Sequence, residues 1–182
     1  MERSTAVPAS DKSIEYMREA IREARKALEE GEIPVGAVIV HEGKIIGRGH
    51  NTTEQDGDPS AHAEINAIRQ AGRYLRETLS WRRLTDCHLY VTMEPCSMCA
   101  GALVWARVES ITAGVPDPKA GGCGSVLNVI QEERLNHQIQ YRELEECAEK
   151  DACRGMLQDF FRELRKKPKW QNRHIKPEDI IK

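Results

Sequence analysis

Residues 87–99 read CHLYVTMEPCSMC, a stretch that combines a change of secondary structure with a pair of cysteines. Cys87 to Thr92 contains Leu, Tyr, Val and Thr, a composition that predicts a strand. Pro95 ends this strand and suits the first turn of a helix, which we expect from Cys96 to about Trp105. The stretch therefore predicts a strand that passes directly into a helix, with Cys96 and Cys99 at the helix start.

Strands and helices alternate on both sides of this stretch. We expect helices at 11–30, 61–75, 96–105 and 145–166, and strands at 35–40, 45–50, 87–92, 110–113 and 138–141. Loops are predicted at 51–59 and 116–124, with a brief helical turn within 126–131. The first two strands form a hairpin, so the sheet is mixed rather than all parallel. The pattern predicts an α/β fold, with a three-layer α/β/α arrangement around a mixed five-stranded sheet.

The length of 182 residues suits one domain with a sizeable core. We place that domain at 12–167, between a mobile tail at 1–11 and a basic, loosely ordered tail at 168–182. The formal net charge of -2 excludes a globally basic nucleic-acid-binding protein, so an RNA partner would have to meet a local patch. The longest apolar run, 35–40, is too short to span a membrane, and the first dozen residues lack the apolar core of a signal peptide. We expect a cytoplasmic protein.

The chain has six cysteines, which we expect to stay reduced in that compartment. The pair Cys96 and Cys99 is then a metal-binding or a redox-active motif. The other four are interpreted as small buried hydrophobic residues: Cys87, Cys123, Cys147 and Cys153.

A metal site is favoured because His62 and Glu64 lie at the start of another predicted helix. His62, Cys96 and Cys99 supply three ligands of the kind that zinc prefers, and three protein ligands leave the fourth tetrahedral position open for catalysis. Glu64 then stands beside the metal as a general acid and base. A structural zinc site would need a fourth ligand, for which His88 or Cys123 are the candidates. We prefer the catalytic zinc, because His-x-Glu combined with Pro-Cys-x-x-Cys is the signature of zinc nucleobase deaminases.

On these residues the chain resembles the cytidine deaminase-like superfamily, and within it the bacterial tRNA-specific adenosine deaminases. The resemblance extends from about Tyr16 to Lys167. The motifs that carry it are IPVGAV at 33–38, AHAE at 61–64, LYVTMEPC at 89–96, MCAGA at 98–102, DPKAG at 117–121, LNH at 135–137 and FFRELR at 160–165. The motifs before residue 103 are shared across the superfamily, whereas the later ones are more typical of the tRNA enzymes.

The resemblance implies a zinc-dependent hydrolase that converts adenosine to inosine at the wobble position, A34, of the tRNA anticodon stem-loop. It also implies a homodimer with one Zn2+ per subunit and with sites that include residues of both subunits. The implied metal ligands are His62, Cys96 and Cys99, and Glu64 is the implied catalytic proton shuttle. The implied substrate-binding residues are Asn51, which would hydrogen-bond the flipped base, Pro34 and Val35 in the pocket wall, and Asp117, Lys119, Asn136 and His137 near the anticodon loop.

The residues after 160 are consistent with an RNA partner. Seven lysines and arginines stand between Phe160 and Lys176 against one acid, Glu163. Such a patch predicts contact with a tRNA backbone, although the charge alone fits a solvated tail equally well. We expect at least one of Phe160 and Phe161 in the core, since adjacent residues cannot share a helix face.

Two other functions stay open. The first is a free-base deaminase acting on guanine or cytosine, because Trp105 and residues 111–116 differ from the usual pattern of the tRNA enzymes. A bulky Trp near the pocket would favour a free base, unless it packs in the core. The second is a non-catalytic RNA-binding subunit, against which the intact Glu64 argues. Turnover without RNA would distinguish the first alternative.

Overall fold

The computed structural model describes residues 11–80 and 83–166, and its elements alternate as the sequence predicts. The tails predicted at 1–11 and 168–182 lie outside the described residues, except for Asp11, the first residue of α1. The helices are α1 (Asp11–Glu29), α2 (Thr53–Asp56), α3 (Ala63–Leu79), α4 (Ser97–Ala106) and α5 (Ala148–Lys166), with a 3-10 turn η1 (Val129–Gln131). The strands are β1 (Gly36–His41), β2 (Lys44–His50), β3 (Cys87–Met93), β4 (Ser110–Val115) and β5 (Gln140–Glu143).

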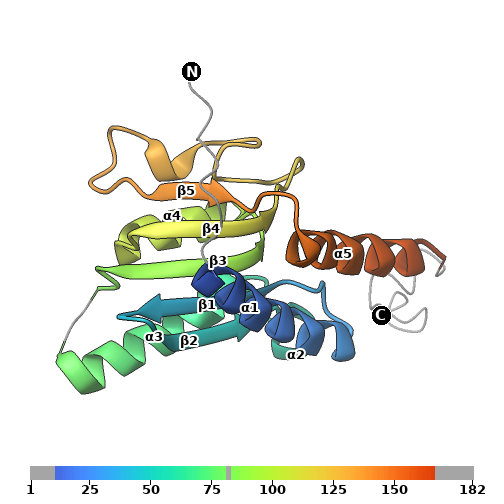
Figure 1. The fold of residues 1–182 in the computed structure, drawn as a ribbon, viewed down its shortest axis with the longest axis horizontal. Helices are drawn as coiled ribbons and strands as arrows, with labels where there is room; N and C mark the ends of the chain where they lie inside the picture. The colour runs from blue at the N-terminus through green and yellow to red at the C-terminus, as the bar shows by residue number, and fades with distance from the viewer. Residues whose placement is uncertain (1–10, 81–82, 167–182) are drawn as a thin grey trace, which may run out of the picture.

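The five strands form one mixed sheet in the order β2-β1-β3-β4-β5 (Figure 1). β1 pairs antiparallel with β2 and with β3, whereas β3, β4 and β5 run parallel to one another. The predicted mixed five-stranded sheet is therefore confirmed. Because β3 and β4 run in the same direction, their carboxyl ends, Met93 and Val115, lie side by side at the same end of the sheet.

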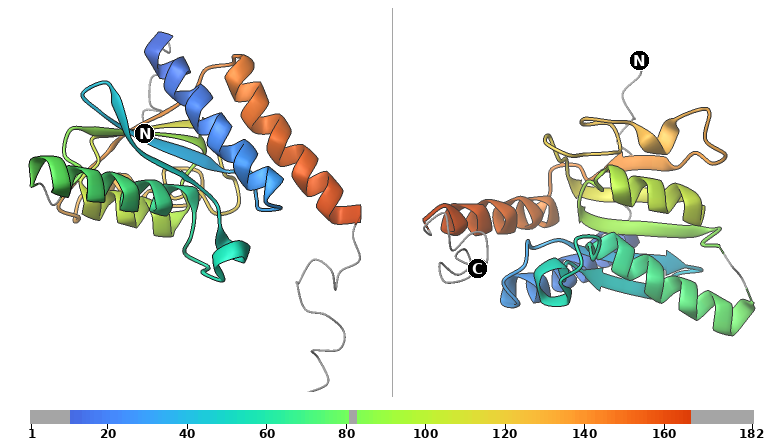
Figure 2. Two further views of the ribbon diagram at one scale, coloured as in Figure 1. Left: turned by 90° about the horizontal axis from the view of Figure 1, so that it is seen from below. Right: turned by 180° about the vertical axis from the view of Figure 1, so that it is seen from behind.

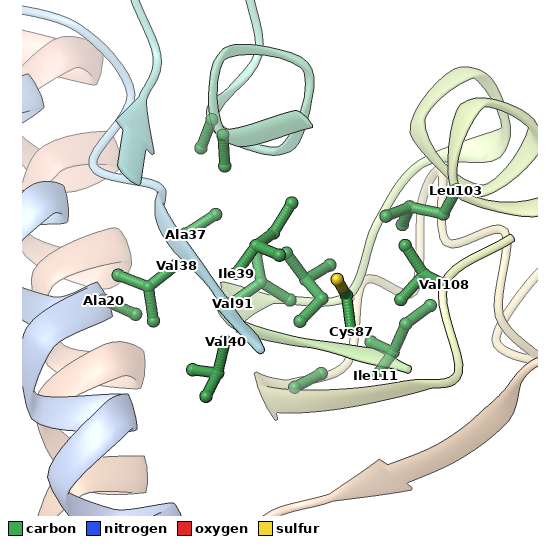
Figure 3. Packing of buried hydrophobic residues seen from close by; sticks show 14 of the residues in the cluster. Ala20, Ala37, Val38, Ile39, Val40, Cys87, Val91, Leu103, Val108 and Ile111 are labelled. Carbon is green, nitrogen blue, oxygen red and sulfur yellow. The ribbon is translucent and has the colours of Figure 1, made fainter. Parts of the chain in front are cut away.

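Helices cover both faces of this sheet, as predicted for a three-layer α/β/α fold. α1 and α5 lie on one face and α3 and α4 on the other (Figure 2). Both faces of β1 are buried: Val38 points toward Ala20 of α1, and Ile39 points to the side on which Leu103 of α4 lies (Figure 3). Among the described residues, no helix has the length and the apolar character needed to cross a bilayer.

The structure corrects several predicted boundaries, most clearly in the loop predicted at 51–59, which contains the short helix α2. A buried carboxylate from another part of the chain organises this helix. Glu32 accepts hydrogen bonds from the backbone N–H of Glu54 at 2.7 Å and of Gln55 at 3.0 Å, and from the Thr53 hydroxyl at 2.9 Å. These bonds satisfy donors that a helix start leaves unpaired. The sequence did not reveal the helix because its cap is supplied by Glu32 rather than by a neighbouring residue. β5 also starts two residues later than predicted.

The start of α3 is held against β2 at a glycine. A Cβ atom placed on Gly49 would lie 2.2 Å from the carbonyl oxygen of Ala63, the first residue of α3. Only glycine therefore allows the first turn of this helix to approach the strand so closely. This contact positions His62, which directly precedes the helix.

We predict that Gly49→Ala lowers the free energy of unfolding by about 1–3 kcal/mol, because the added methyl group forces α3 away from β2. Gly72→Ala in α3 is the matched control. Nothing lies within 4 Å of a Cβ at that position, so the exchange should stabilise the helix by about 0.5–1 kcal/mol. Urea unfolding of both variants measures the difference. Equal stability of the two would show that the close contact at Gly49 is unimportant.

Candidate metal centre and active-site pocket

Three candidate ligand atoms come together where α3 and α4 begin. His62 is the residue before α3, Cys96 is the residue before α4, and Cys99 lies in the first turn of α4. The Nδ1 atom of His62 lies 3.7 Å from the Cys96 sulfur and 3.6 Å from the Cys99 sulfur. Within 11–80 and 83–166, this is the group of His, Cys, Asp or Glu side chains close enough to hold a metal ion.

The three side chains of this group shift one another's pKa values. Two hydrogen bonds lower the pKa of the Cys96 thiol to about 4. The bond from Cys99 has the larger effect and the bond from His62 the smaller. The bond with Cys96 and burial raise the pKa of Cys99, and the bond with Cys96 raises that of His62. Cys96 is thus the thiolate of the group, and its hydrogen bonds favour the protonated forms of Cys99 and His62. Because metal ions bind the deprotonated forms of these side chains, a bound metal would replace those protons.

Glu64 lies in the first turn of α3, two residues after His62, and is buried. Burial raises the pKa of its carboxyl group from an ordinary 4.5 to about 7. A carboxyl group with this pKa can both accept and release a proton at neutral pH. Its position beside the three ligand atoms is compatible with the predicted role of a proton shuttle, which stays a prediction.

A pocket of about 950 Å³ opens beside these residues, at the carboxyl ends of β3 and β4. Of the predicted substrate-binding residues, four line it: Val35, Asn51, Asp117 and Lys119. Asn51 is buried and joins two parts of the wall. Its side-chain oxygen accepts a hydrogen bond from the Ala63 N–H at 2.9 Å, and its backbone N–H donates to the Val35 carbonyl at 3.2 Å.

Three other predicted residues lie outside this pocket. The chain turns at Pro34, where the Val35 N–H donates to the Ile33 carbonyl at 2.7 Å, so the side chains on either side of Pro34 line the pocket instead. Asn136 and His137 lie at the opposite ends of the strands. The Asn136 carbonyl accepts a hydrogen bond from Arg107, and the His137 ring donates to the Val108 carbonyl at 2.7 Å. Within one chain, these two residues are therefore remote from the candidate metal centre.

The far wall of the pocket comes from α5, which the sequence reasoning did not assign to it. The residues concerned are Arg154, Leu157, Gln158, Phe161, Arg162 and Arg165. Their spacing of three and four residues marks one helix face, but only the fold shows that this face borders the pocket. Phe161 is 36% exposed, and neither it nor Phe160 belongs to the buried core, so the expectation that at least one of them is a core residue was wrong.

Trp105 does not occupy the position that would favour a free base. It lies at the end of α4, is 74% exposed, and neither lines the pocket nor packs in the core. The two candidates for a fourth metal ligand are also placed elsewhere. His88 contacts the Ser110 hydroxyl at 2.8 Å, and the Cys123 sulfur lies 3.9 Å from the Pro95 carbonyl. Neither belongs to the three-residue group.

A second buried carboxylate, Glu94, holds the loop that carries Asp117 and Lys119. It accepts hydrogen bonds from the backbone N–H groups of Asp117 at 2.9 Å, Cys123 at 3.0 Å and Ser125 at 3.1 Å, and from the Ser125 hydroxyl. A Cβ on Gly121 would lie 2.5 Å from the Glu94 carboxyl carbon, so the loop passes directly over it. In the sequence, the sign that Glu94 could organise a loop was its position directly before Pro95, where the strand ends.

Comparison with known proteins gives consistent results. A family model of the MafB19-like deaminases matches residues 11–165. The tRNA-specific adenosine deaminase of Bacillus subtilis (strain 168) is 49% identical over 160 residues, which cover 88% of this chain and 95% of that protein. A solved structure from studies of A-to-I editing by tRNA:A34 deaminases is 36% identical, with a TM-score of 0.71, and the match covers 79% of this chain and 99% of that one.

A guanine deaminase is also similar to this chain, with a lower sequence identity and a lower TM-score than the tRNA:A34 deaminase structure. The structure of guanine deaminase from Bacillus subtilis is 30% identical with a TM-score of 0.53, over 85% of this chain and 94% of that chain. The fold is thus common to both kinds of enzyme. The similarity is greater to the tRNA enzymes.

We predict that Glu94→Gln lowers the free energy of unfolding by roughly 1–3 kcal/mol, because an amide nitrogen would then face backbone N–H donors. Since Glu94 touches the loop rather than the metal ligands, metal content should stay unchanged. Chemical denaturation and metal analysis test both parts. Glu77→Gln, an exposed change on α3, should shift stability by no more than about 0.5 kcal/mol. A Glu94 variant as stable as that control would contradict this role.

Proposed function

We propose that this chain, which belongs to the MafB19-like deaminases and among them to the tRNA-specific adenosine deaminases, converts adenosine to inosine at wobble position 34 of tRNA. The observation that carries the proposal is the combination of a proton carrier beside three metal ligands with a large pocket whose rim bears cationic side chains. Its cationic members are Lys119, Arg154, Arg162 and Arg165.

The ligand geometry supports zinc as the metal, with one ion in each subunit. Zinc lies about 2.3 Å from a thiolate and about 2.0–2.1 Å from an imidazole nitrogen in tetrahedral sites. Those bond lengths place the nitrogen and each sulfur about 3.6 Å apart. The distances from His62 to Cys96 and Cys99, 3.7 and 3.6 Å, agree with this spacing. Three protein ligands leave the fourth position to water or substrate, as in catalytic zinc sites.

The reaction replaces the amino group at C6 of adenine with an oxygen from water and releases ammonia. A bound zinc ion makes water a nucleophile at neutral pH by lowering its pKa. Glu64 accepts a first proton as water attacks C6 and delivers it to the neighbouring ring nitrogen. It then accepts the second proton from the new C6 hydroxyl and delivers it to the departing amine, so that C6 keeps the oxygen and ammonia leaves. Its raised pKa suits each of these transfers. Asn51 and Val35 line the same pocket, and we assign to them the orientation of the base.

The form of the pocket favours a nucleotide within RNA over a free base. Its volume, about 950 Å³, lies at the upper end of the range of small-molecule sites, roughly 300–1,000 Å³. Apolar residues such as Ile33 and Met93 line it, and Phe161 lies at its α5 side. RNA-binding proteins hold unstacked bases against such apolar and aromatic walls and contact phosphates with arginine and lysine. We assign phosphate contacts to Lys119 and Arg165.

We also propose that the protein works in the cytoplasm, with residues 12–167 as its single catalytic domain. All six cysteines are free thiols, as expected in a reducing compartment. The core cluster spans elements from α1 to α5, which supports one domain over this range.

A homodimer is supported by an apolar surface on α4 and the loop beside it, formed by Met98, Trp105, Val126 and Leu127. Met98 and Trp105 are seven residues apart and so share one face of α4. Their side chains and those of the loop are 39% to 74% exposed. Contiguous exposed apolar groups of this kind mark interaction sites. Asn136 and His137, which are remote from the pocket of their own chain, are then assigned to the site of the partner subunit.

The direct test of the proposed activity uses the zinc-loaded protein with two substrates: an anticodon stem-loop carrying A34, and guanine. We expect one inosine at position 34 and one ammonia for each stem-loop converted, and no ammonia from guanine. Glu64→Ala should retain zinc and lose at least about 100-fold in turnover, since the proton transfers are removed. Turnover of guanine with an unchanged stem-loop would contradict the tRNA substrate, and full activity of Glu64→Ala would contradict the mechanism.

For the dimer, we expect Trp105→Glu to yield a folded monomer, because burying an unpaired charge within the interface costs more free energy than the contact returns. Sedimentation velocity gives the molecular mass, and circular dichroism verifies the fold. Leu28→Glu replaces another exposed apolar residue, on α1, and should leave the dimer intact. A folded Trp105→Glu dimer would show that this surface is not the interface.

A further inference from the structure

The outward face of α3 carries three arginines that the active-site pocket does not use: Arg69, Arg73 and Arg76. The helix buries Ala63, Ala67, Ala71 and Leu75 against the sheet. At about 100° per residue, the three arginines fall within one stripe on roughly the opposite side of the helix axis. They therefore point away from the sheet. Figure 2 shows α3 running along the outside of the molecule.

These arginines are poorly neutralised by the protein itself. Arg69 lies 3.7 Å from Asp58, and Arg76 lies 3.8 Å from Glu77. Arg73 makes no ion pair or side-chain hydrogen bond with any residue in 11–80 or 83–166. Cationic residues of α5 are paired more closely, with Arg162 at 2.5 Å from Asp159 and Lys166 at 2.7 Å from Glu163.

The stripe is thus a local excess of positive charge on a chain whose formal net charge is -2. A surface of this kind attracts a polyanion, whose phosphates gain contacts with guanidinium groups and release counterions. Closely paired cations such as Arg162 and Lys166 would first have to lose their carboxylate partners.

The position of the stripe determines which part of a nucleic acid it can reach. α3 begins at the metal centre, because His62 directly precedes it. With a rise of about 1.5 Å per residue, Arg73 and Arg76 lie on the order of 16 and 21 Å further along the axis. A nucleotide inserted in the pocket does not extend this far. The RNA that reaches the stripe must belong to the segment that flanks the loop.

We propose that the arginine stripe of α3 (Arg69, Arg73 and Arg76) is a second RNA-binding surface, which contacts backbone phosphates of the duplex stem while the loop enters the pocket. This inference rests on the proposed function, since it takes the substrate to be a stem-loop. It assigns to α3 a contribution to affinity that does not depend on base sequence, because phosphates carry no sequence information. The pocket and its α5 rim then select the reacting nucleotide.

The test compares two RNAs and two double variants in the zinc-loaded, full-length Glu64→Ala protein, which binds RNA without turnover. One RNA is the anticodon stem-loop, and the other is a single strand with the loop sequence alone. Arg73→Gln/Arg76→Gln removes two charges from the stripe and leaves Arg69, which also contacts Asn66 near the site. Lys12→Gln/Arg25→Gln removes the same charge from α1, on the other face of the sheet, where neither cation has a carboxylate partner among the described side chains.

The stripe variant should bind the stem-loop about tenfold more weakly at roughly 0.1 M salt, with the slope of log Kd against log salt reduced by about two. Its affinity for the single strand should be unchanged, and the α1 variant should match the parent protein with both RNAs. Unchanged stem-loop affinity, or an equal loss with both RNAs, would overturn the inference. Inosine formation by the wild-type protein at saturating stem-loop tests the proposed function separately, because it does not require the stripe.

Discussion

The site depends on the meeting of two helix starts. His62 precedes α3 and Cys96 precedes α4, and close backbone packing at Gly49 fixes α3 against β2. The two helix N-termini bring positive ends of backbone dipoles to the same place, which favours a thiolate at Cys96. With Cys99 one turn further on, three ligand atoms converge, and the first turn of α3 places Glu64 beside them. If either helix moved, the three candidate ligands and Glu64 would separate, so the proposed chemistry depends on the position of the two helices.

Two buried carboxylates extend this arrangement outward from the metal centre. Glu32 organises the segment around α2, and Glu94 organises the loop that carries Lys119. In both cases the carboxylate accepts backbone N–H groups from a loop that would otherwise lack partners. The walls of the pocket are thereby fixed without regular secondary structure. α5 forms the remaining wall of the pocket. It supplies the arginines of the rim, which the residues near the candidate metal centre lack.

The sequence predicted those features that depend on neighbouring residues. The spacing of Cys96 and Cys99 at a helix start places both sulfurs on one side, and the alternation of strands and helices indicated the layers. Features that depend on the folded chain were missed or misjudged. Phe161 lines the pocket because α5 crosses the end of β4, and Trp105 is exposed because α4 ends at the surface. No local pattern distinguishes these positions from core positions. The placement of His137 away from the pocket likewise follows from the path of the chain after β4.

We expect the three ligands to hold one zinc ion with an open fourth position beside Glu64. Anomalous diffraction at the zinc absorption edge, from crystals of the zinc-loaded protein, tests this most directly. We expect one ion in each chain, about 2.0–2.1 Å from the His62 nitrogen and about 2.3 Å from the sulfurs of Cys96 and Cys99, with its fourth ligand from outside the protein. A fourth protein ligand such as Cys123, or an ion bound elsewhere, would contradict the account.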